Sequence, residues 1–454
     1  MKYENQTKRS ERVTFGMYFI GQLFIYTLVS GYLQLYFTDI GIPAMVVGVI
    51  FMVAKIWDAV NDPVFGVLID RTNPKGGKFT PWIKVSSFLI PAATVLLFAI
   101  PNGASIQVKT IWAVAAYLLW DTAYTLSDVP IYSLSTAITS VIPERNKLLY
   151  VAKLCGFVGV IPVSVAIPIL YPSIGWFATA LILAFFALPT MVPIGFLAKE
   201  RTHVASDEKV SVKKLVSYLF NNKYLITYVL VVLVMSLTGF SGTVRNYLAL
   251  YVLGGSEWIA VMNLTYVLPL LFGPFLYPLL NKFMSRSRLF GISGIVLYAL
   301  CLTQFFFGYS NVTLFLVLDV LRSIFSGIIA VGLTMSIADC VIYGTYKTGE
   351  RAEAITFSVQ TFCAKITSAV AGAIGMFALG VIGFIAGEGV AQTQKVVDSI
   401  FFMYSGAPFI SGTIAMIIWL VIFRLKDKDI TTMSKCNSGE ISRDEAEKLL
   451  SCKY

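Results

Sequence analysis

Four polar side chains within nine residues form the part of this sequence best suited to chemistry. The stretch "KIWDAVNDP" places Lys55, Asp58, Asn61 and Asp62 at spacings of three and four residues. At 3.6 residues per turn, all four lie on one face of a helix. The runs on both sides are apolar, and an ionised group at the centre of a membrane-spanning helix costs about 2.5 to 3.5 kcal/mol. Some interaction must therefore offset these charges.

A bound cation would offset them. Two carboxylates and an amide oxygen are the oxygen ligands that a hard cation such as Na⁺ prefers. Neighbouring carboxylates in a low dielectric also repel each other, so the same pair could hold a proton instead. The alternative is a structural ion pair between Lys55 and one aspartate. That pair would leave the negative charge of the second aspartate without a partner inside the membrane. The stripe predicts a cation site.

A second polar stripe lies in "WDTAYTLSDVPIYS". It consists of Asp121, Tyr124, Thr125 and Asp128, and the first three lie seven, four and three residues before the last. Acids inside membrane helices usually face a cavity or a partner. Lys153 and Lys365 add cations from two other apolar segments.

Further charges and aromatic rings surround these stripes. Asp319 and Arg322 are three residues apart, which favours a local ion pair, and Arg245 has no assigned role. Aromatic residues near the stripes, such as Tyr124 and Tyr132, could stack on a sugar ring, although packing in the core is the commoner role of any single ring.

The composition identifies the elements that must position these residues. The chain of 454 residues is 57% hydrophobic and only 13% charged, and its mean hydropathy is +0.76. Soluble proteins carry about 25% charged residues. The net charge of +10 lies in short loops without interleaved aromatics, which argues against nucleic acid as a partner. The six cysteines show no metal-type spacing and are expected to be reduced. The sequence indicates an integral membrane protein that crosses the bilayer many times.

Apolar segments of membrane-spanning length divide the chain into two groups of six. They run approximately over residues 13–37, 44–70, 82–100, 108–140, 148–171, 175–197, 224–253, 258–280, 289–308, 312–337, 352–385 and 400–423. The prediction is an all-α polytopic membrane protein with 12 transmembrane helices in two six-helix bundles, as in transporters built from parallel repeats. The N-terminal bundle covers residues 1–198, a central loop 199–223, the C-terminal bundle 224–424, and a tail 425–454.

Basic residues in the loops predict the orientation. Loops on one side are rich in Lys and Arg, and only Lys109 and Lys395 break the alternation. Both termini and the central loop are therefore expected in the cytoplasm, with the chain in the cell membrane. In the tail, Ser442 and Glu445 predict the start of a short helix.

Three blocks of sequence resemble one transporter family. They are "AKIWDAVNDPVFGVLIDRTNPKGGKFTPWI", "YTLSDVPIYSL" and "IADCVIYGTYKTGERAEAITFSVQTFCAKI". Together they are similar to the glycoside-pentoside-hexuronide:cation symporter family, of the melibiose permease type, within the major facilitator superfamily. The resemblance implies the major facilitator fold, a sugar as substrate, and Na⁺ or H⁺, with Li⁺ as a further candidate, as the coupling cation. No cofactor is implied, and a regulatory partner in the cytoplasm is left open.

The resemblance also implies site residues. The family's cation ligands correspond to Asp58, Asn61, Asp62 and Thr125. Its substrate contacts correspond to Asp128, Tyr132, Lys153, Gln360, Thr361 and Lys365, and Tyr124 joins them from the polar stripe. Two of these differ in type, since Tyr132 stands where the family has Trp and Lys153 where it has Arg. A third departure matters more: the acidic sugar-binding residue of the first helix corresponds to Leu23, which is preceded by Gln22. Because Leu cannot accept a hydroxyl hydrogen bond, the galactoside specificity of the melibiose permease type does not transfer to this chain. A different glycoside, a pentoside or a uronide remains open as the substrate.

The sequence thus predicts a secondary active transporter that carries a sugar with Na⁺ or H⁺ by alternating access, and not an enzyme. An uncoupled facilitator or a carrier of amphiphilic lipid with the same fold is the first alternative. An intramembrane prenyltransferase is a remote one, because its motif needs an acid where Phe65 stands.

Overall fold

The computed structural model describes residues 6–72, 76–201, 220–237, 239–349 and 353–452. They divide into two compact units. Unit 1 comprises Met1–Asp207, Gly254–Val261 and Met376–Thr393, and unit 2 comprises Glu208–Leu253, Met262–Gly375 and Gln394–Tyr454. The predicted central loop 199–223 lies largely outside the described residues. Residues 254–261 and 376–393 group with unit 1, whereas the predicted boundaries assign them to the C-terminal bundle.

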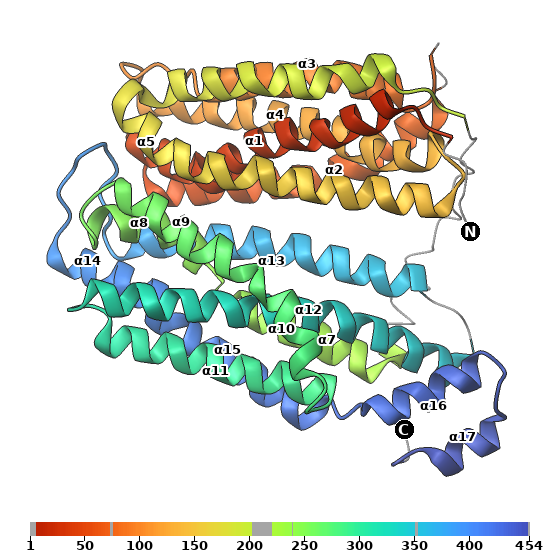
Figure 1. Cartoon of the computed structure of the whole chain (residues 1–454). Coiled ribbons are helices and arrows are strands. Elements are labelled where there is room, and N and C mark those ends of the chain that lie inside the picture. Colours follow the sequence, from red (N-terminus) through yellow and green to blue (C-terminus); the bar gives the residue numbers. More distant parts are fainter. Residues whose placement is uncertain (1–5, 73–75, 202–219, 238, 350–352, 453–454) are drawn as a thin grey trace. The chain divides into compact units, whose positions relative to one another are not determined.

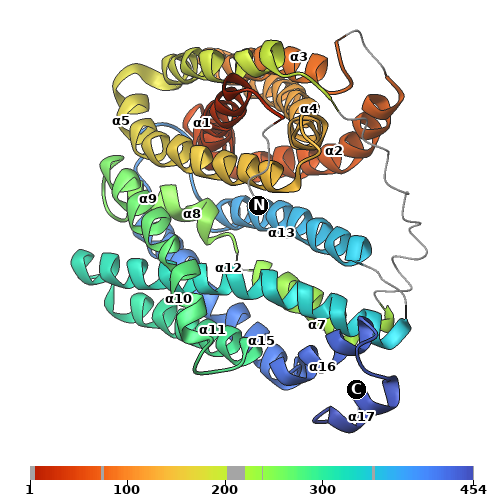
Figure 2. The same ribbon diagram turned by 45° about the vertical axis from the view of Figure 1, so that its right-hand side comes forward.

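Five long helices make up most of unit 1, coloured red to yellow in Figure 1 and again in Figure 2. They are α1 (Arg9–Asp39), α2 (Ala44–Arg71), α3 (Thr80–Leu97), α4 (Ile106–Ala137) and α5 (Ile142–Leu197). The last of these has 56 residues and contains a kink at Gly175, whose φ of 83° is not helical. The predicted fifth and sixth segments therefore follow each other with only this bend between them.

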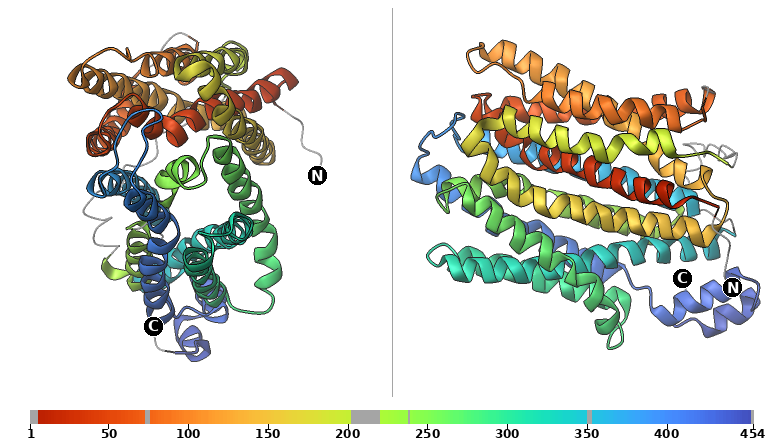
Figure 3. Two further views of the ribbon diagram at one scale, coloured as in Figure 1. Left: turned by 90° about the vertical axis from the view of Figure 1, so that its left-hand side faces the viewer. Right: turned by 45° about the horizontal axis from the view of Figure 1, so that its top comes forward.

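Unit 2 contains helices that are more often interrupted. They are α7 (Lys223–Ser236), α8 (Ser241–Tyr251), α9 (Glu257–Leu270), α10 (Phe272–Leu280), α11 (Arg286–Phe307), α12 (Val312–Thr348), α13 (Glu353–Val381), α14 (Gln394–Phe401), the π-helix η1 (Phe402–Gly406) and α15 (Ala407–Ile422), followed by α16 (Asp427–Asn437) and α17 (Arg443–Leu449). Helices α9 and α13 contribute residues to both units. The right-hand view of Figure 3 shows the two short C-terminal helices, in dark blue, beyond the end of the helix α15 that precedes them.

The described helices agree with the predicted membrane segments. Ten of them, some joined across short breaks, are long and apolar enough to cross a membrane. One is α5, which at 56 residues is long enough to cross twice. The segment missing from the ten is α4, whose 32 residues include Lys109, Asp121 and Asp128. When α5 is counted as two crossings and α4 is added, the described residues give the predicted twelve crossings.

Helices α1 and α5 approach each other through glycines. A Cβ on Gly159 would lie 2.8 Å from the carbonyl oxygen of Ile20, and a Cβ on Gly21 would lie 2.8 Å from that of Ala187. No side chain fits at either position, so the two backbones pack directly against each other, as small residues allow in membrane proteins.

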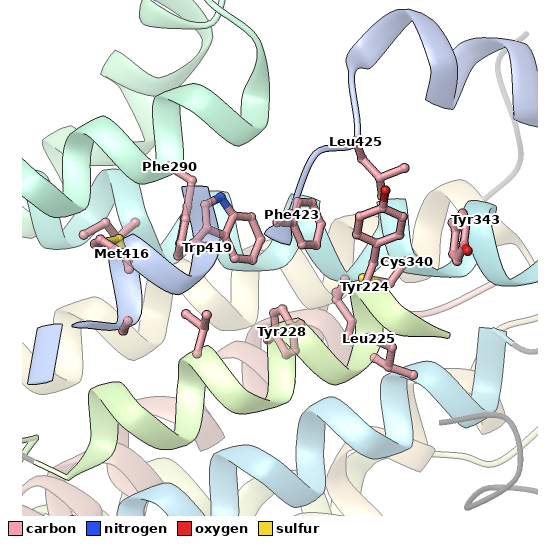
Figure 4. Packing of buried hydrophobic residues seen from close by; sticks show 14 of the residues in the cluster. Tyr224, Leu225, Tyr228, Phe290, Cys340, Tyr343, Met416, Trp419, Phe423 and Leu425 are labelled. Carbon is pink, nitrogen blue, oxygen red and sulfur yellow. The ribbon is translucent and has the colours of Figure 1, made fainter. Parts of the chain in front are cut away.

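Aromatic and aliphatic side chains fill the interior of unit 2. Figure 4 shows Trp419 of α15, and Phe423 directly after that helix, beside Phe290 of α11 and Tyr228 of α7. The rings of Trp419 and Phe423 stack with centroids 3.8 Å apart. In the tail, the backbone N–H of Glu445 donates to the Ser442 hydroxyl at 3.2 Å, so the predicted start of the last helix is confirmed.

Candidate functional site

Side-chain hydrogen bonds join α2 to α4 over two successive turns. The Trp57 indole N–H donates to the Thr122 hydroxyl at 2.9 Å. One turn further along, the Asn61 amide donates to the Thr125 hydroxyl at 3.1 Å, and that hydroxyl donates to Asp62 at 3.1 Å. Three of the four residues predicted as cation ligands thus form one hydrogen-bonded chain between two helices.

Asp58 lies one turn before Asp62 and makes a different contact. Its carboxylate forms an ion pair with Lys55 at 3.6 Å, and the side chain of the aspartate is 16% exposed. Asn61 and Thr125 are buried. Within the described residues, no group of three or more His, Cys, Asp or Glu could hold a metal ion. A cation here would therefore need the amide and hydroxyl oxygens as well as the two carboxylates.

A third helix reaches the polar stripe of α4 near Asp128. The Gln22 amide of α1 donates to Asp128 Oδ1 and to the Ser127 hydroxyl, each at 3.4 Å. Tyr18 of α1 hydrogen-bonds Ser127 as well. Leu23 points elsewhere, since its Cδ1 approaches Gly156 of α5. In the sequence, Leu23 occupies the position of the family's acidic sugar-binding residue. In the structure, its neighbour Gln22 contacts Asp128, a candidate substrate-binding residue.

The predicted aromatic residues belong to two separate clusters of rings. Tyr124 stacks on Trp120 with centroids 5.2 Å apart and contacts Tyr26 at 5.4 Å. Tyr132 lies two turns along α4, is 53% exposed, and packs against Phe19 at 5.5 Å. The exposed ring of Tyr132 is available to a ligand, whereas Tyr124 presents an already assembled aromatic surface.

The remaining predicted substrate residues lie on α5 and α13. Lys153 of α5 is exposed, and within the described residues it makes no ion pair with a carboxylate. Gln360, Thr361 and Lys365 lie on α13 in the part that belongs to unit 2. Lys153 thus belongs to unit 1 and the three α13 residues belong to unit 2, so the assembly of all four into one site stays a prediction.

Unit 2 contains a buried charged cluster that sequence spacing does not reveal. Arg245 of α8 pairs with Asp319 of α12 at 3.8 Å. Tyr404 of the π-helix donates to Asp319 and accepts from Arg245 at 2.8 Å. Arg322 instead donates to Gln304. The predicted local pair of Asp319 with Arg322 is therefore wrong, because a residue 74 positions away in sequence takes the carboxylate.

Comparison with known proteins identifies the family. The family model described as "MFS/sugar transport protein" matches residues 14–427. The chain belongs to the MFS/sugar transport protein family. It is therefore a multi-pass membrane transporter and not an enzyme, and the prenyltransferase alternative is excluded.

Full-length relatives support this family membership. The chain is 31% identical over 438 residues to "Uncharacterized symporter YjmB" of Bacillus subtilis (strain 168), covering 94% of both proteins. It is 28% identical over 442 residues to "Isoprimeverose transporter" of Lactiplantibacillus pentosus, covering 92% of this chain and 89% of the relative. Among solved structures, the nucleoside transporter NupG matches with a TM-score of 0.63 at 14% identity, covering 92% of this chain and all of that one. The structural match supports the major facilitator fold.

Proposed function

We propose that this protein is a symporter that carries a sugar together with Na⁺ or H⁺. The observation that supports the proposal best is the hydrogen-bonded chain from Asn61 through Thr125 to Asp62. It joins an amide, a hydroxyl and a carboxylate between two helices that are long and largely apolar. A cation bound there would offset the cost of burying Asp58 and Asp62.

Thr125 would link cation binding to sugar binding. It contacts the cation ligands on α2, and Asp128 lies three residues further along α4 on the same face. A cation that draws Asp62 and Thr125 toward itself would orient Asp128 for a sugar hydroxyl. The coupling must be reciprocal, so the sugar would tighten cation binding by the same factor.

The sugar would bind between hydrogen-bonding groups and an aromatic surface. Asp128 can accept hydrogen bonds from hydroxyls, and the Gln22 amide can both donate and accept. The stacked rings of Tyr124 and Trp120 offer an apolar face to C–H groups. With Tyr132, Lys153, Gln360, Thr361 and Lys365, these residues form the proposed substrate site. A neutral glycoside fits the relative named as an isoprimeverose transporter, and the two lysines would also accept a uronide.

The orientation in the membrane is part of the proposal. Basic residues gather in the loops on the side of both termini, which the positive-inside rule assigns to the cytoplasm. The chain would thus lie in the cell membrane with both termini inside, and its two bundles would expose the site alternately to each side.

The experiment that tests this function measures sugar accumulation in liposomes containing the purified protein. A panel of glycosides, pentosides and uronates is offered with an inward Na⁺ gradient, with an inward H⁺ gradient, or with neither. At least one sugar is expected to accumulate above its external concentration with one of the gradients. An ionophore that dissipates the gradient should release the accumulated sugar.

Other outcomes would contradict the proposal in recognisable ways. Uptake that only equilibrates the sugar and ignores both gradients would identify an uncoupled facilitator. Failure to carry any sugar, together with transfer of a labelled lysolipid, would identify a lipid carrier.

Gln22→Leu is expected to weaken binding of the transported sugar by about tenfold, because it removes a hydrogen bond near Asp128. Cation affinity should change little. The measurement is the sugar concentration that half-saturates thermal stabilisation of the purified protein. Leu23→Met is the control, since it changes the neighbouring apolar side chain at nearly constant volume. Equal affinities for wild type and Gln22→Leu would remove Gln22 from the site.

A further inference from the structure

A pocket of about 740 Å³ opens at one end of unit 2, where α11 and α16 begin and α15 ends. One wall is the stretch from Asn281 to Arg288, and the other is the stretch from Leu420 to Lys428. The volume is within the range of small-molecule binding sites.

The charges that line this pocket are strongly unbalanced. Five cationic side chains line it: Lys282, Arg288, Arg424, Lys426 and Lys428. The lining contains one acid, Asp427, and Arg286 already contacts it at 3.3 Å. Within the described part of the chain, none of the five cations forms an ion pair with a carboxylate. The positive-inside rule accounts for basic residues in a loop, but it does not require them to converge on a pocket.

Exposed apolar side chains line the pocket or adjoin it. Phe283 adjoins Lys282 and is 83% exposed, the highest value among the large hydrophobic side chains of the described residues. On the other wall, Leu420, Val421 and Ile422 form the exposed end of the membrane helix α15. Cations and exposed apolar side chains therefore meet at one place, at the boundary of a transmembrane helix.

The two walls are held together by packing and hydrogen bonds. The Trp419 indole donates to the carbonyl oxygen of Ser287 at 3.1 Å, and the Ser287 hydroxyl donates to that of Phe423 at 2.8 Å. Phe290 packs on Trp419 with ring centroids 4.4 Å apart. Figure 4 shows Phe290, Trp419 and Phe423 in this arrangement. The pocket is thus bounded by a fixed contact between α11 and α15.

We propose that this pocket binds the phosphate headgroup of an anionic phospholipid. The five cations would neutralise the phosphate, and the acyl chains would run over Leu420, Val421 and Phe283. Anionic headgroups bind basic pockets between membrane helices through this combination of charge and apolar contact. A lipid satisfies both halves of the surface, whereas a free phosphate would use only the cations. The proposal is independent of which sugar or cation the protein transports.

The test measures retained lipid by native mass spectrometry of the full-length protein in detergent. Phosphatidylglycerol and phosphatidylcholine with the same acyl chains are added separately, and glycerol 1-phosphate serves as the water-soluble phosphate. The pocket variant carries Arg288→Gln and Lys426→Gln. The control variant carries Lys435→Gln and Lys448→Gln, two exposed lysines of α16 and α17 that do not line the pocket. Both variants lose the same charge.

Wild type and the control variant are expected to retain phosphatidylglycerol in preference to phosphatidylcholine. The pocket variant should bind phosphatidylglycerol about 30-fold more weakly, because each of the two cations contributes about fivefold at a membrane surface. Equal retention of phosphatidylglycerol by all three proteins would overturn the site. Equal retention of the two lipids by wild type, or competition by glycerol 1-phosphate at the same concentrations as the lipid, would overturn its assignment to an anionic lipid. A normal circular dichroism spectrum and melting temperature verify that the variants are folded.

Discussion

Cysteine in place of either Asp58 or Asp62 is expected to abolish the cation-stimulated accumulation of sugar. Each substitution removes one carboxylate from the polar face of α2 and leaves the cation with fewer charged ligands. Loss of one charged ligand should weaken cation binding by about 10- to 100-fold. The measurement is sugar accumulation in liposomes against the Na⁺ or H⁺ gradient, together with exchange of internal for external sugar, which needs no gradient.

A matched pair of threonine variants separates cation binding from simple packing. Thr125→Val and Thr122→Val remove one hydroxyl each from α4, and both hydroxyls join α4 to α2. Only Thr125 contacts the predicted ligands Asn61 and Asp62. Thr125→Val should weaken cation binding by about tenfold, and Thr122→Val should leave it within about twofold. Cation-stimulated accumulation that persists in both aspartate variants would show that the coupling site lies elsewhere.

The second large effect concerns stability. Asp319→Ala is expected to destabilise the protein by about 3 to 5 kcal/mol, because it leaves the guanidinium of Arg245, whose side chain is only 12% exposed, without its carboxylate. The loss should appear as a lower melting temperature of the purified protein. Asp398→Ala is the control: this acid is exposed and contacts Tyr309 and Gln394, so its removal should leave the melting temperature near that of wild type.

A double variant distinguishes an unpaired charge from lost packing. Arg245→Met combined with Asp319→Leu removes both charges and keeps apolar volume, which can recover most of the stability that breaking a buried pair costs. If Asp319→Ala melts at the wild-type temperature, the cluster around Tyr404 is not a stabilising one. If the double variant is no more stable than Asp319→Ala, the loss arises from packing and not from charge.

The helices could be predicted from the sequence because a membrane span needs only a long apolar run, and spacing alone aligned Asp58, Asn61 and Asp62 on one face. The partners of these residues follow less directly. Successive side chains along a helix point in directions about 100° apart, so a shift of one position changes which helix a side chain faces. Matching the family's first helix to this sequence therefore gave Leu23, whereas Gln22 is the residue that points toward α4.

Charges that pair across helices are harder still to predict. The spacing of Asp319 and Arg322 satisfies a local rule, yet Arg245 pairs with the aspartate because tertiary packing brings α8 to α12. Lys109, which breaks the predicted alternation of loop charges, donates to the carbonyl oxygen of Ile40 at 2.7 Å. It thus binds the carboxyl end of α1, where a cation is favoured, and its position says little about membrane orientation.

The contact of α1 with α5 through Gly21 and Gly159 limits how this protein can move. Backbones in direct contact cannot slide or rotate past each other without a clash, so we expect α1 and α5 to move as one rigid pair. Gln22 follows Gly21 on this pair, and Asp128 belongs to α4. A movement of the pair relative to α4 would break the bond between Gln22 and Asp128, and a movement that preserves the bond would have to carry α4 along. The proposed sugar site would in this way be coupled to the motion of the helices within unit 1.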